Sequence, residues 1–325
     1  MNNVTINEKK GLFSRLTEKK IKKGSCCCNI ELEEVPENDT KEKKEACSCS
    51  GADCCGSGSD MIENKEEIRE HILKNYEGVA LKGSQGCGCG CNTLQREGNP
   101  LDLKELSLNI GYSESDLTGV PNDANMGLGC GNPIAIAALK AGETVLDLGS
   151  GGGFDCFLAR KQVGETGFVI GVDMTSEMIK LSRMNAEKSE YSNMEFRLGE
   201  IEHLPIADAS VDVIISNCVI NLSLEKELVF KDAFRVLKHG GRLSISDIVA
   251  TAELPQNIKQ DLSMMAGCIS GAEHIGNIKK MLEETGFINI KMSPKDNSRQ
   301  ILKTWAPDRK IEDFVASFII EAQKN

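Results

Sequence analysis

Residues 144–153, Thr-Val-Leu-Asp-Leu-Gly-Ser-Gly-Gly-Gly, decide the fold. The first five residues form a short apolar run that is typical of a buried strand, and the glycines allow a sharp turn into a helix predicted over 153–164. Farther along, apolar runs alternate with amphipathic helical segments, the runs lying at 167–173, 193–199, 211–220 and 242–249 and the segments at 175–189 and 224–241. Strands that alternate with helices predict a doubly wound, mostly parallel α/β sheet.

The flanking regions differ from this domain in composition. Residues 1–60 contain 10 basic, 11 acidic and few large apolar side chains, so we expect a flexible leader that carries seven cysteines. Residues 61–78 space isoleucines at helical intervals and predict a helical cap on a domain of residues 61–250. Residues 251–325 are expected to form a small C-terminal α+β region, with helices at 262–274 and 275–287, strands at 288–293 and 301–306, and a last helix from about 310.

Charge and composition exclude several classes of protein. The formal net charge of −11 disfavours nucleic acid and anionic membranes as partners. The chain has no apolar run of about 18 residues, which a membrane-spanning helix needs. Its polar beginning lacks the apolar segment of a secretory signal, so we expect a cytoplasmic protein. In such a protein, 14 cysteines indicate metal, metalloid or redox chemistry more often than structural disulfides.

The glycine loop is typical of a site for a nucleoside-containing cofactor. Asp173 ends the next predicted strand, 20 residues after Gly153, where a carboxylate could bind both ribose hydroxyls. A dinucleotide prefers the spacing G-x-G-x-x-G, whereas this loop has G-x-G-x-G with Asp147 two residues ahead of it. A carboxylate there suits a cofactor with an ammonium group, so we expect S-adenosylmethionine. A dinucleotide, or a tight turn without a ligand, is the alternative.

Three more residues fit the same outline. Ile201 and Glu202 follow the third predicted strand, where they could contact an adenine ring or simply belong to a solvated loop. Asp155 lies in the first turn of the helix after the glycines. It could help to hold the methionine end of the cofactor, or only interact favourably with the helix dipole.

Four cysteines lie in the predicted domain and its C-terminal extension. Cys218 ends the fourth strand, where parallel sheets bind ligands, and Cys130 and Cys268 are flanked by glycines. Cys156 lies on the apolar face of a helix, where we expect it to pack in the core. The other three lack the paired spacing of a zinc site, so a soft three-coordinate ion such as trivalent arsenic fits better. An inert, buried thiol is the alternative for Cys218.

Six segments together resemble the microbial arsenite S-adenosylmethionine methyltransferases: GLGCGNP, VLDLGSGGGFDCFLA, GVDMT, SNCVINL, RVLKHGG and AGCISGA. The resemblance extends from about residue 62 to the C-terminus, and SNCVINL with the two glycine-flanked cysteines is its most specific part. It implies a Rossmann-like class I methyltransferase that methylates arsenite and methylated arsenicals for detoxification.

The resemblance also implies roles for individual residues. Cys130, Cys218 and Cys268 match thiols that bind As(III), and Cys130 matches one that forms a disulfide with an N-terminal cysteine. Cys87, Cys89 and Cys91 are the candidates for that partner, and we take Cys89 as the catalytic one. Glutathione or thioredoxin would restore the thiols. The expected cofactor-binding residues are Asp147, Gly149, Ser150, Gly151, Asp155, Asp173, Met174, Ile201, Glu202 and Asn217.

The sequence departs from the family pattern in two places. The cysteine-rich leader is not part of the pattern, and Gly267 stands before Cys268 where animal relatives carry an acidic residue, so no ligand is expected from that position.

Two other functions are the alternatives. One is a methyltransferase that acts on another small molecule, which would leave the three cysteines without a role. The other is a thiol-rich protein that sequesters metalloids without consuming S-adenosylmethionine.

Overall fold

The computed structural model describes residues 65–82, 103–189, 191–306 and 309–325. The chain divides into residues 1–56 and residues 57–325, and every described residue belongs to the second unit. The whole leader, residues 1–60, and Cys87, Cys89 and Cys91 lie outside the described residues. No helix in the described part of the chain is long and apolar enough to cross a membrane.

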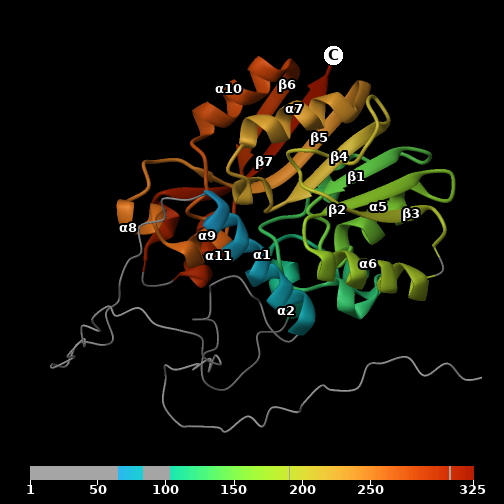
Figure 1. The fold of residues 1–325 in the computed structure, drawn as a ribbon, viewed down its shortest axis with the longest axis horizontal. Helices are drawn as coiled ribbons and strands as arrows, with labels where there is room; N and C mark the ends of the chain where they lie inside the picture. The colour runs from blue at the N-terminus through green and yellow to red at the C-terminus, as the bar shows by residue number, and fades with distance from the viewer. Residues whose placement is uncertain (1–64, 83–102, 190, 307–308) are drawn as a thin grey trace, which may run out of the picture. The chain divides into compact units, whose positions relative to one another are not determined.

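Seven strands form one sheet in the order β3-β2-β1-β4-β5-β7-β6 (Figure 1). All pairs among β1 to β5 are parallel, whereas β7 runs antiparallel to both of its neighbours. This topology confirms the doubly wound, mostly parallel α/β fold and adds two C-terminal strands to the same sheet. The strands are β1 (Thr144–Leu148), β2 (Phe168–Asp173), β3 (Met194–Leu198), β4 (Val211–Asn217), β5 (Leu237–Ala250), β6 (Phe287–Pro294) and β7 (Val315–Lys324).

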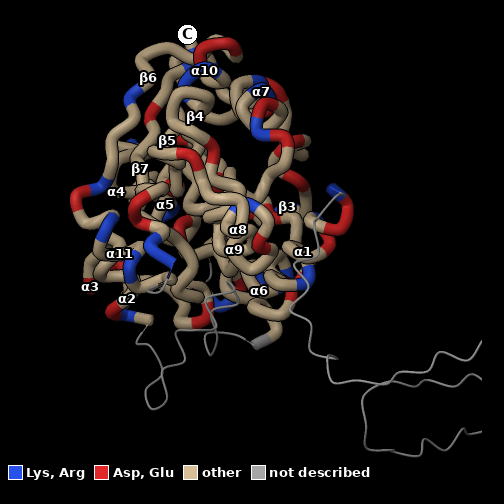
Figure 2. Tube along the Cα trace, turned by 90° about the vertical axis from the view of Figure 1, so that its left-hand side faces the viewer, with Lys and Arg blue, Asp and Glu red and all other residues tan. Residues whose placement is uncertain are grey.

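Helices pack on both faces of this sheet and along its carboxyl edge (Figure 1). Acidic and basic residues alternate along outer helices such as α7, consistent with the mixed surface charge in Figure 2. The α-helices are α1 (Lys65–Lys82), α2 (Leu103–Asn109), α3 (Glu114–Thr118), α4 (Ile134–Ala137), α5 (Phe154–Val163), α6 (Ser176–Ser189), α7 (Lys226–Val236), α8 (Gln256–Lys259), α9 (Leu262–Ala266), α10 (Ile275–Thr285) and α11 (Ser298–Trp305). Short 3-10 turns are η3 (Asn122–Ala124), η4 (Ile220–Leu222) and η5 (Ile311–Asp313).

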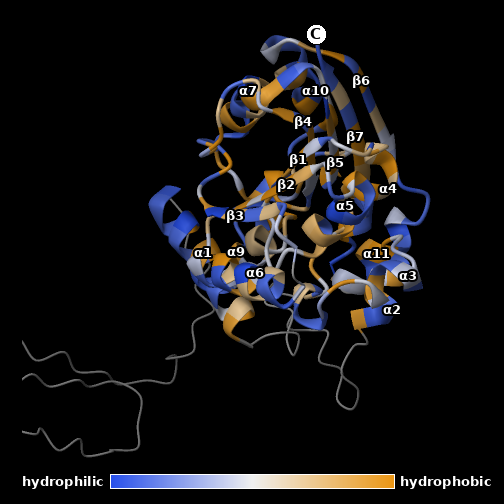
Figure 3. Ribbon diagram, turned by 90° about the vertical axis from the view of Figure 1, so that its right-hand side faces the viewer, coloured by the Kyte–Doolittle hydropathy of each residue, from blue (hydrophilic) through white to orange (hydrophobic). Residues whose placement is uncertain are grey.

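Successive residues of the central strands pack into two different hydrophobic cores, one on each face of the sheet. Leu146 and Leu148 of β1 pack with α7 and α10, whereas Val145 packs with α5 on the other face. The same alternation continues in β4, which is largely hydrophobic in Figure 3, in contrast to the hydrophilic α1. Successive side chains of a strand point to opposite faces, so a strand covered on both faces is a continuous apolar run. On the α5 side the next position after Val145 is Asp147, which places a carboxylate inside the protein.

The expectation for the C-terminal tail is wrong. Residues 298–305 form helix α11 instead of a strand, and residues 315–324 form strand β7 instead of a helix. In α11, Ile301, Leu302 and Trp305 recur at helical spacing and pack inward. Strand β7 fills the gap between β5 and β6, and its hydrogen bonds to both neighbours are long-range pairings that a local sequence pattern does not reveal.

Several predicted boundaries also shift. The helical segment predicted over 262–274 ends at Ala266, because Cys268 has a positive φ of 62°. The helix predicted over 224–241 ends at Val236, and β5 begins at Leu237 with a bulge before Arg242 pairs with Val213. The apolar run at 211–220 leaves the strand after Asn217, because Cys218 adopts a positive φ of 57°. This left-handed residue turns the chain at the carboxyl edge of the sheet.

Candidate active site

The glycine loop after β1 makes a close backbone approach to the loop after β4. Gly149 and Gly151 adopt positive φ angles of 69° and 50°, which glycine reaches without a steric penalty. A Cβ at Gly149 would lie 2.2 Å from Val219 Cγ2. The Asp173 carboxylate fixes the loop, because its oxygens accept hydrogen bonds from the Gly151 N–H at 2.9 Å and the Thr175 N–H at 2.8 Å.

Two polar side chains beside this loop have few partners. Asp147 is 3% exposed, and its one hydrogen-bond donor among the described residues is the Cys156 thiol, at 3.3 Å from Oδ2. Burial, and next the charge of Asp155, raises the pKa of Asp147 well above its ordinary value. The buried Ser150 hydroxyl has no hydrogen-bond partner in the described part of the chain. A ligand with an ammonium group and further polar atoms fits this donor and acceptor set, as S-adenosylmethionine would.

A buried network connects the helix after the glycine loop to Cys130. The Tyr112 hydroxyl donates to Asp155 Oδ1 at 2.7 Å, and Asn217 Nδ2 donates to Oδ2 at 3.3 Å. Burial raises the pKa of Asp155 to about 6, although these two hydrogen bonds favour its charged form. Asn217 Oδ1 accepts a hydrogen bond from the Cys130 N–H at 3.1 Å. Asn217 therefore joins the expected cofactor side to the expected arsenic side.

The structure brings Cys130, Cys218 and Cys268 into one cluster. All three are buried and free of disulfide bonds. The Cys268 thiol donates to the Cys218 carbonyl at 2.8 Å. Burial, followed by contacts with the thiols of Cys130 and Cys268, raises the pKa of Cys218 well above its ordinary value. Cys156 instead packs in the core on α5, as predicted.

Both Cys218 and Cys268 have left-handed backbone conformations, with φ of 57° and 62°. Such a conformation costs a non-glycine residue roughly 1–3 kcal/mol and persists where surrounding contacts impose it. The Cys218 N–H donates to the Ser246 carbonyl at 2.8 Å, and Asn221 Nδ2 donates to the Cys268 carbonyl at 3.1 Å. These contacts hold the two thiols on fixed turns.

The remaining predicted cofactor residues follow β2 and β3 at the same edge. Met174 is half-buried directly after Asp173, and Ile201 packs in the core. Glu202 is buried, and its Oε1 accepts a hydrogen bond from the Ser223 hydroxyl at 2.5 Å. The Arg69 guanidinium of α1 lies 4.0 Å from the same oxygen. Glu202 is therefore a partnered side chain, and its contact with adenine stays a prediction.

Three residues near the thiols were not predicted. The Tyr76 hydroxyl of α1 donates to the Ala266 carbonyl at 3.1 Å, and Lys295 Nζ donates to the Cys130 carbonyl at 3.3 Å. Burial lowers the pKa of Lys295, and the charges of Cys130 and Cys218 oppose that shift. Asp247 lies on β5, near the carboxyl edge of the sheet, but nothing in that predicted strand distinguishes it from a structural carboxylate. Tyr76 and Lys295 lie outside the alternating strands and helices. The sequence pattern therefore does not indicate that these two residues lie near the thiols.

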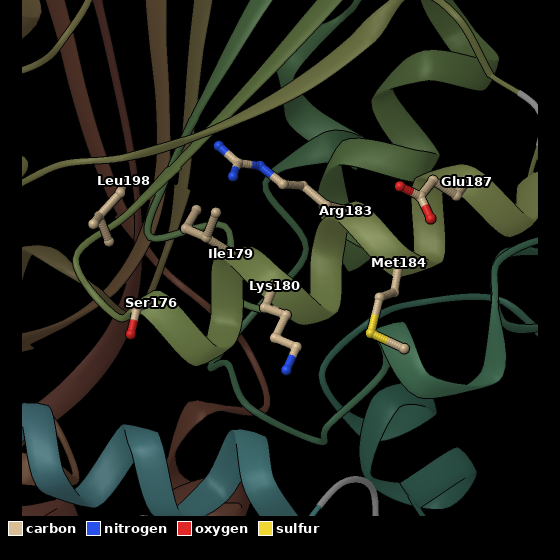
Figure 4. Close-up of a pocket in the computed structure, with 7 residues that line it drawn as sticks. All are labelled: Ser176, Ile179, Lys180, Arg183, Met184, Glu187 and Leu198. Carbon is tan, nitrogen blue, oxygen red and sulfur yellow. The ribbon is translucent and has the colours of Figure 1, made fainter. Parts of the chain in front are cut away.

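A shallow pocket on the outer side of α6 lies apart from the predicted site (Figure 4). No predicted site residue lines it. Its lining residues are Ser176, Ile179, Lys180, Arg183, Met184, Glu187 and Leu198.

Comparisons with known proteins agree with this geometry. Residues 139–286 match a family described as a methyltransferase domain. The arsenite methyltransferase of Halobacterium salinarum is 48% identical over 262 residues, which cover 80% of this chain and 67% of that protein. The chain belongs to the arsenite methyltransferase family. This membership confirms the identification made from the sequence, namely a methyltransferase that uses S-adenosylmethionine and acts on arsenite.

More distant arsenite methyltransferases show the same relationship. The human arsenite methyltransferase is 38% identical over 231 residues, which cover 68% of this chain and 58% of that protein. The chain thus spans little more than half of that relative. The crystal structure of an arsenic(III) S-adenosylmethionine methyltransferase from Chlamydomonas reinhardtii superimposes with a TM-score of 0.50 at 29% identity, covering 69% of this chain and 74% of the other.

Proposed function

We propose that this arsenite methyltransferase holds trivalent arsenic on the thiols of Cys218 and Cys268, with Cys130 as the third thiol, while it is methylated. The convergence of these three buried cysteines beside the glycine loop carries the proposal. Thiolates are soft donors that select soft ions. Arsenite and methylated arsenicals are the proposed substrates, and mono-, di- or trimethylated species are the products.

Substrate loading would occur by exchange at the thiols. Each S–H proton passes to the hydroxide or thiolate that leaves arsenic, and an S–As bond replaces an As–O or As–S bond. The exchange is balanced without an external base. It therefore suits the Cys218 thiol, which burial keeps protonated at neutral pH.

The glycine loop and its neighbours would hold the cofactor. The Asp147 carboxylate would bind the ammonium group, and the Ser150 hydroxyl and the turn at Gly149 and Gly151 would contact the methionine part. Asp173 has acceptor capacity beyond its two N–H donors and would bind the ribose hydroxyls. Four more residues would complete the site around the methionine and adenine ends: Asp155, Met174, Ile201 and Glu202. Asn217 would bridge to the arsenic side.

The chemistry requires positioning more than proton transfer. When bound there, S-adenosylmethionine supplies an electrophilic methyl group to the arsenic lone pair and leaves as S-adenosylhomocysteine. The nucleophile carries no proton, so the chain needs no general base. Its residues fix the thiol-bound arsenic beside the cofactor loop and exclude water, and proximity supplies most of the rate enhancement.

Methylation raises arsenic formally to the pentavalent state, and two thiols would reduce it again by forming a disulfide. We assign this step to Cys130 with one of Cys87, Cys89 and Cys91, Cys89 being the first candidate. Glutathione or thioredoxin would then restore the thiols by exchange. A cytoplasmic location follows from this need, because that compartment keeps thiols reduced.

Product analysis with labelled S-adenosylmethionine, arsenite and a thiol tests the proposal. Cys218→Ser and Cys268→Ser should each abolish transfer of label to arsenite and to its methylated products alike. Cys130→Ser should reduce methylation of arsenite most. Cys156→Ser is the matched control, because Cys156 is equally buried but lies in the core, and it should keep most of the activity.

Two outcomes would reject the assignment. Full activity of Cys218→Ser would show that arsenic binds elsewhere. Label that reaches another acceptor and never arsenic would favour a methyltransferase of a different small molecule.

A further inference from the structure

Cys130 and Cys218 belong to a second set of donors that includes an oxygen. One ligand atom each from Cys130, Cys218 and Asp247 lies within 4.8 Å of the other two, and all three residues are buried. Cys268 is not a member of this set, although its thiol contacts the Cys218 carbonyl. The thiol cluster therefore offers a carboxylate-containing triad beside the three-sulfur arrangement proposed for arsenic.

The Asp247 carboxylate is oriented by its hydrogen bonds. Oδ1 accepts from the Ile248 N–H at 2.7 Å and from Asn221 Nδ2 at 3.1 Å. Oδ2 accepts from the Ile220 N–H at 2.9 Å. A carboxylate has about four acceptor positions, so one remains on Oδ2. Donors of this kind hold metal-binding carboxylates in place in metalloproteins.

The backbones that carry the two thiols are also fixed. The Cys130 carbonyl accepts from the Ser317 hydroxyl at 2.9 Å and from Lys295 Nζ at 3.3 Å. The Cys130 N–H donates to Asn217 Oδ1, and the Cys218 N–H donates to the Ser246 carbonyl. The three segments that carry the donors are hydrogen-bonded to one another, and they form a preorganised site.

The charge of the ionised triad attracts a divalent cation. Two thiolates and one carboxylate carry three negative charges when all are ionised, so a bound divalent ion leaves a charge of −1. The ammonium of Lys295, which interacts electrostatically with Cys130 and Cys218, and that of Lys226, which interacts with Asp247, then act on the remaining negative charge.

We propose that Cys130, Cys218 and Asp247 bind a thiophilic divalent cation of the zinc or cadmium class, which excludes arsenite because both need Cys218. Zinc accepts mixed sulfur and carboxylate donors in a four-coordinate site, so these three donors leave one position for water. Trivalent arsenic takes its donors from sulfur, so Cys268 serves arsenic and Asp247 serves the cation. Cation binding does not depend on the proposed function; only the competition rests on it.

Cadmium binding to the full-length chain tests the site directly. The ten cysteines before residue 92 are replaced by serine so that they do not compete for the ion. Calorimetry and thiolate-to-cadmium absorption should then show one equivalent of Cd²⁺ bound. Cys130→Ser and Cys218→Ser should abolish this binding, and Asp247→Asn should weaken it at least tenfold. Cys156→Ala, which removes another buried cysteine beside a carboxylate, should leave it unchanged.

Cys268→Ser separates the two ions and keeps the test decisive if Asp247→Asn fails to fold. This variant should lose arsenite binding and keep cadmium, and X-ray absorption should show two sulfur ligands with oxygen in the remaining positions. Cadmium binding that needs Cys268 but not Asp247 would overturn the proposal, because the ion would then occupy the arsenic thiols.

The competition is measured as arsenite binding to the same serine-substituted chain. One equivalent of Cd²⁺ should prevent arsenite from binding, and a chelator should restore arsenite binding. Arsenite that binds with the cation still bound would refute the exclusion. Absence of arsenite binding beside intact cadmium binding would refute the proposed function and leave the cation site standing.

Discussion

The proposed contact between the Asp147 carboxylate and the ammonium group of the cofactor predicts the sign of the pH dependence of cofactor binding. Burial, then the charge of Asp155, raises its pKa well above the ordinary value in the free protein. A bound ammonium group would lower that pKa, so binding releases a proton. Affinity for S-adenosylmethionine should therefore rise with pH through the raised pKa of Asp147 and fall below it. Calorimetry in two buffers of different ionisation enthalpy measures the released proton.

Removing the carboxylate should remove the effect. Asp147→Asn is expected to abolish the proton release and to weaken cofactor binding about tenfold, the size of one hydrogen bond to a charged group. Asp212→Asn is the control, because Asp212 lies at the opposite end of β4 and bonds the Thr144 N–H. Proton release that persists in Asp147→Asn would assign the titration to another group.

The candidate site residues could be predicted from the sequence where they lie at the ends of strands. Asp147, Asp173 and Cys218 each end or follow an apolar run, and parallel strands present those positions at a common edge. Asp247 lies in the same kind of run, but nothing local distinguishes it from a structural carboxylate. Tyr76 and Lys295 reach the thiols through contacts between segments far apart in the sequence, which local pattern does not encode.

At the scale of elements, Gly149 determines how closely the loop after β1 approaches the loop after β4. Gly149→Ala must place its Cβ against Val219 and must also adopt a φ of 69°. Gly164→Ala meets a similar φ of 70° but no atom within 4 Å. Gly164 combines this φ with a ψ of −167°, a region essentially restricted to glycine, so Gly164→Ala should lose about 1–3 kcal/mol of unfolding free energy from backbone strain alone. Gly149→Ala should lose more, together with cofactor and arsenite binding, because Val219 follows Cys218.

Urea unfolding and binding measurements on both variants check this prediction. The second substitution Val219→Ala should recover part of the loss in Gly149→Ala by making room. Equal stability and binding in the two glycine variants would show that the loops separate freely.

Some helices and strands could be predicted from their local sequence, whereas others depend on contacts with distant segments. The strands and helices from 144 to 189 follow directly from period and glycine placement, and the structure agrees within a few residues. The order of α11 and β7 was predicted in reverse. Ile301, Leu302 and Trp305 fit either period over so short a segment, and packing decides for the helix. The strand character of β7 comes from partners on both sides.

At the scale of the whole molecule, β7 should be indispensable to the fold. It pairs with β5 along nine residues and with β6 on its other side, and Ser317 bonds the Cys130 carbonyl. Deleting residues 310–325 should abolish cooperative thermal unfolding, measured by circular dichroism. Deleting residues 1–56, which belong to a different unit of the chain from the sheet, should preserve the transition and most of the methylation activity. A truncated chain without β7 that still melts cooperatively would contradict this prediction.

The position of β7 inside the sheet also sets the order of events during synthesis. The ribosome adds residues from the N-terminus, and β1 to β5 can pair as soon as they emerge. Strand β6 cannot join them, because its place in the sheet is separated from β5 by a strand that has not yet been made. The cysteine cluster likewise lacks Ser317 until then. A nascent chain therefore exposes the edge of β5 until residues 315–324 are translated, and its thiols reach their final arrangement only after that strand has formed.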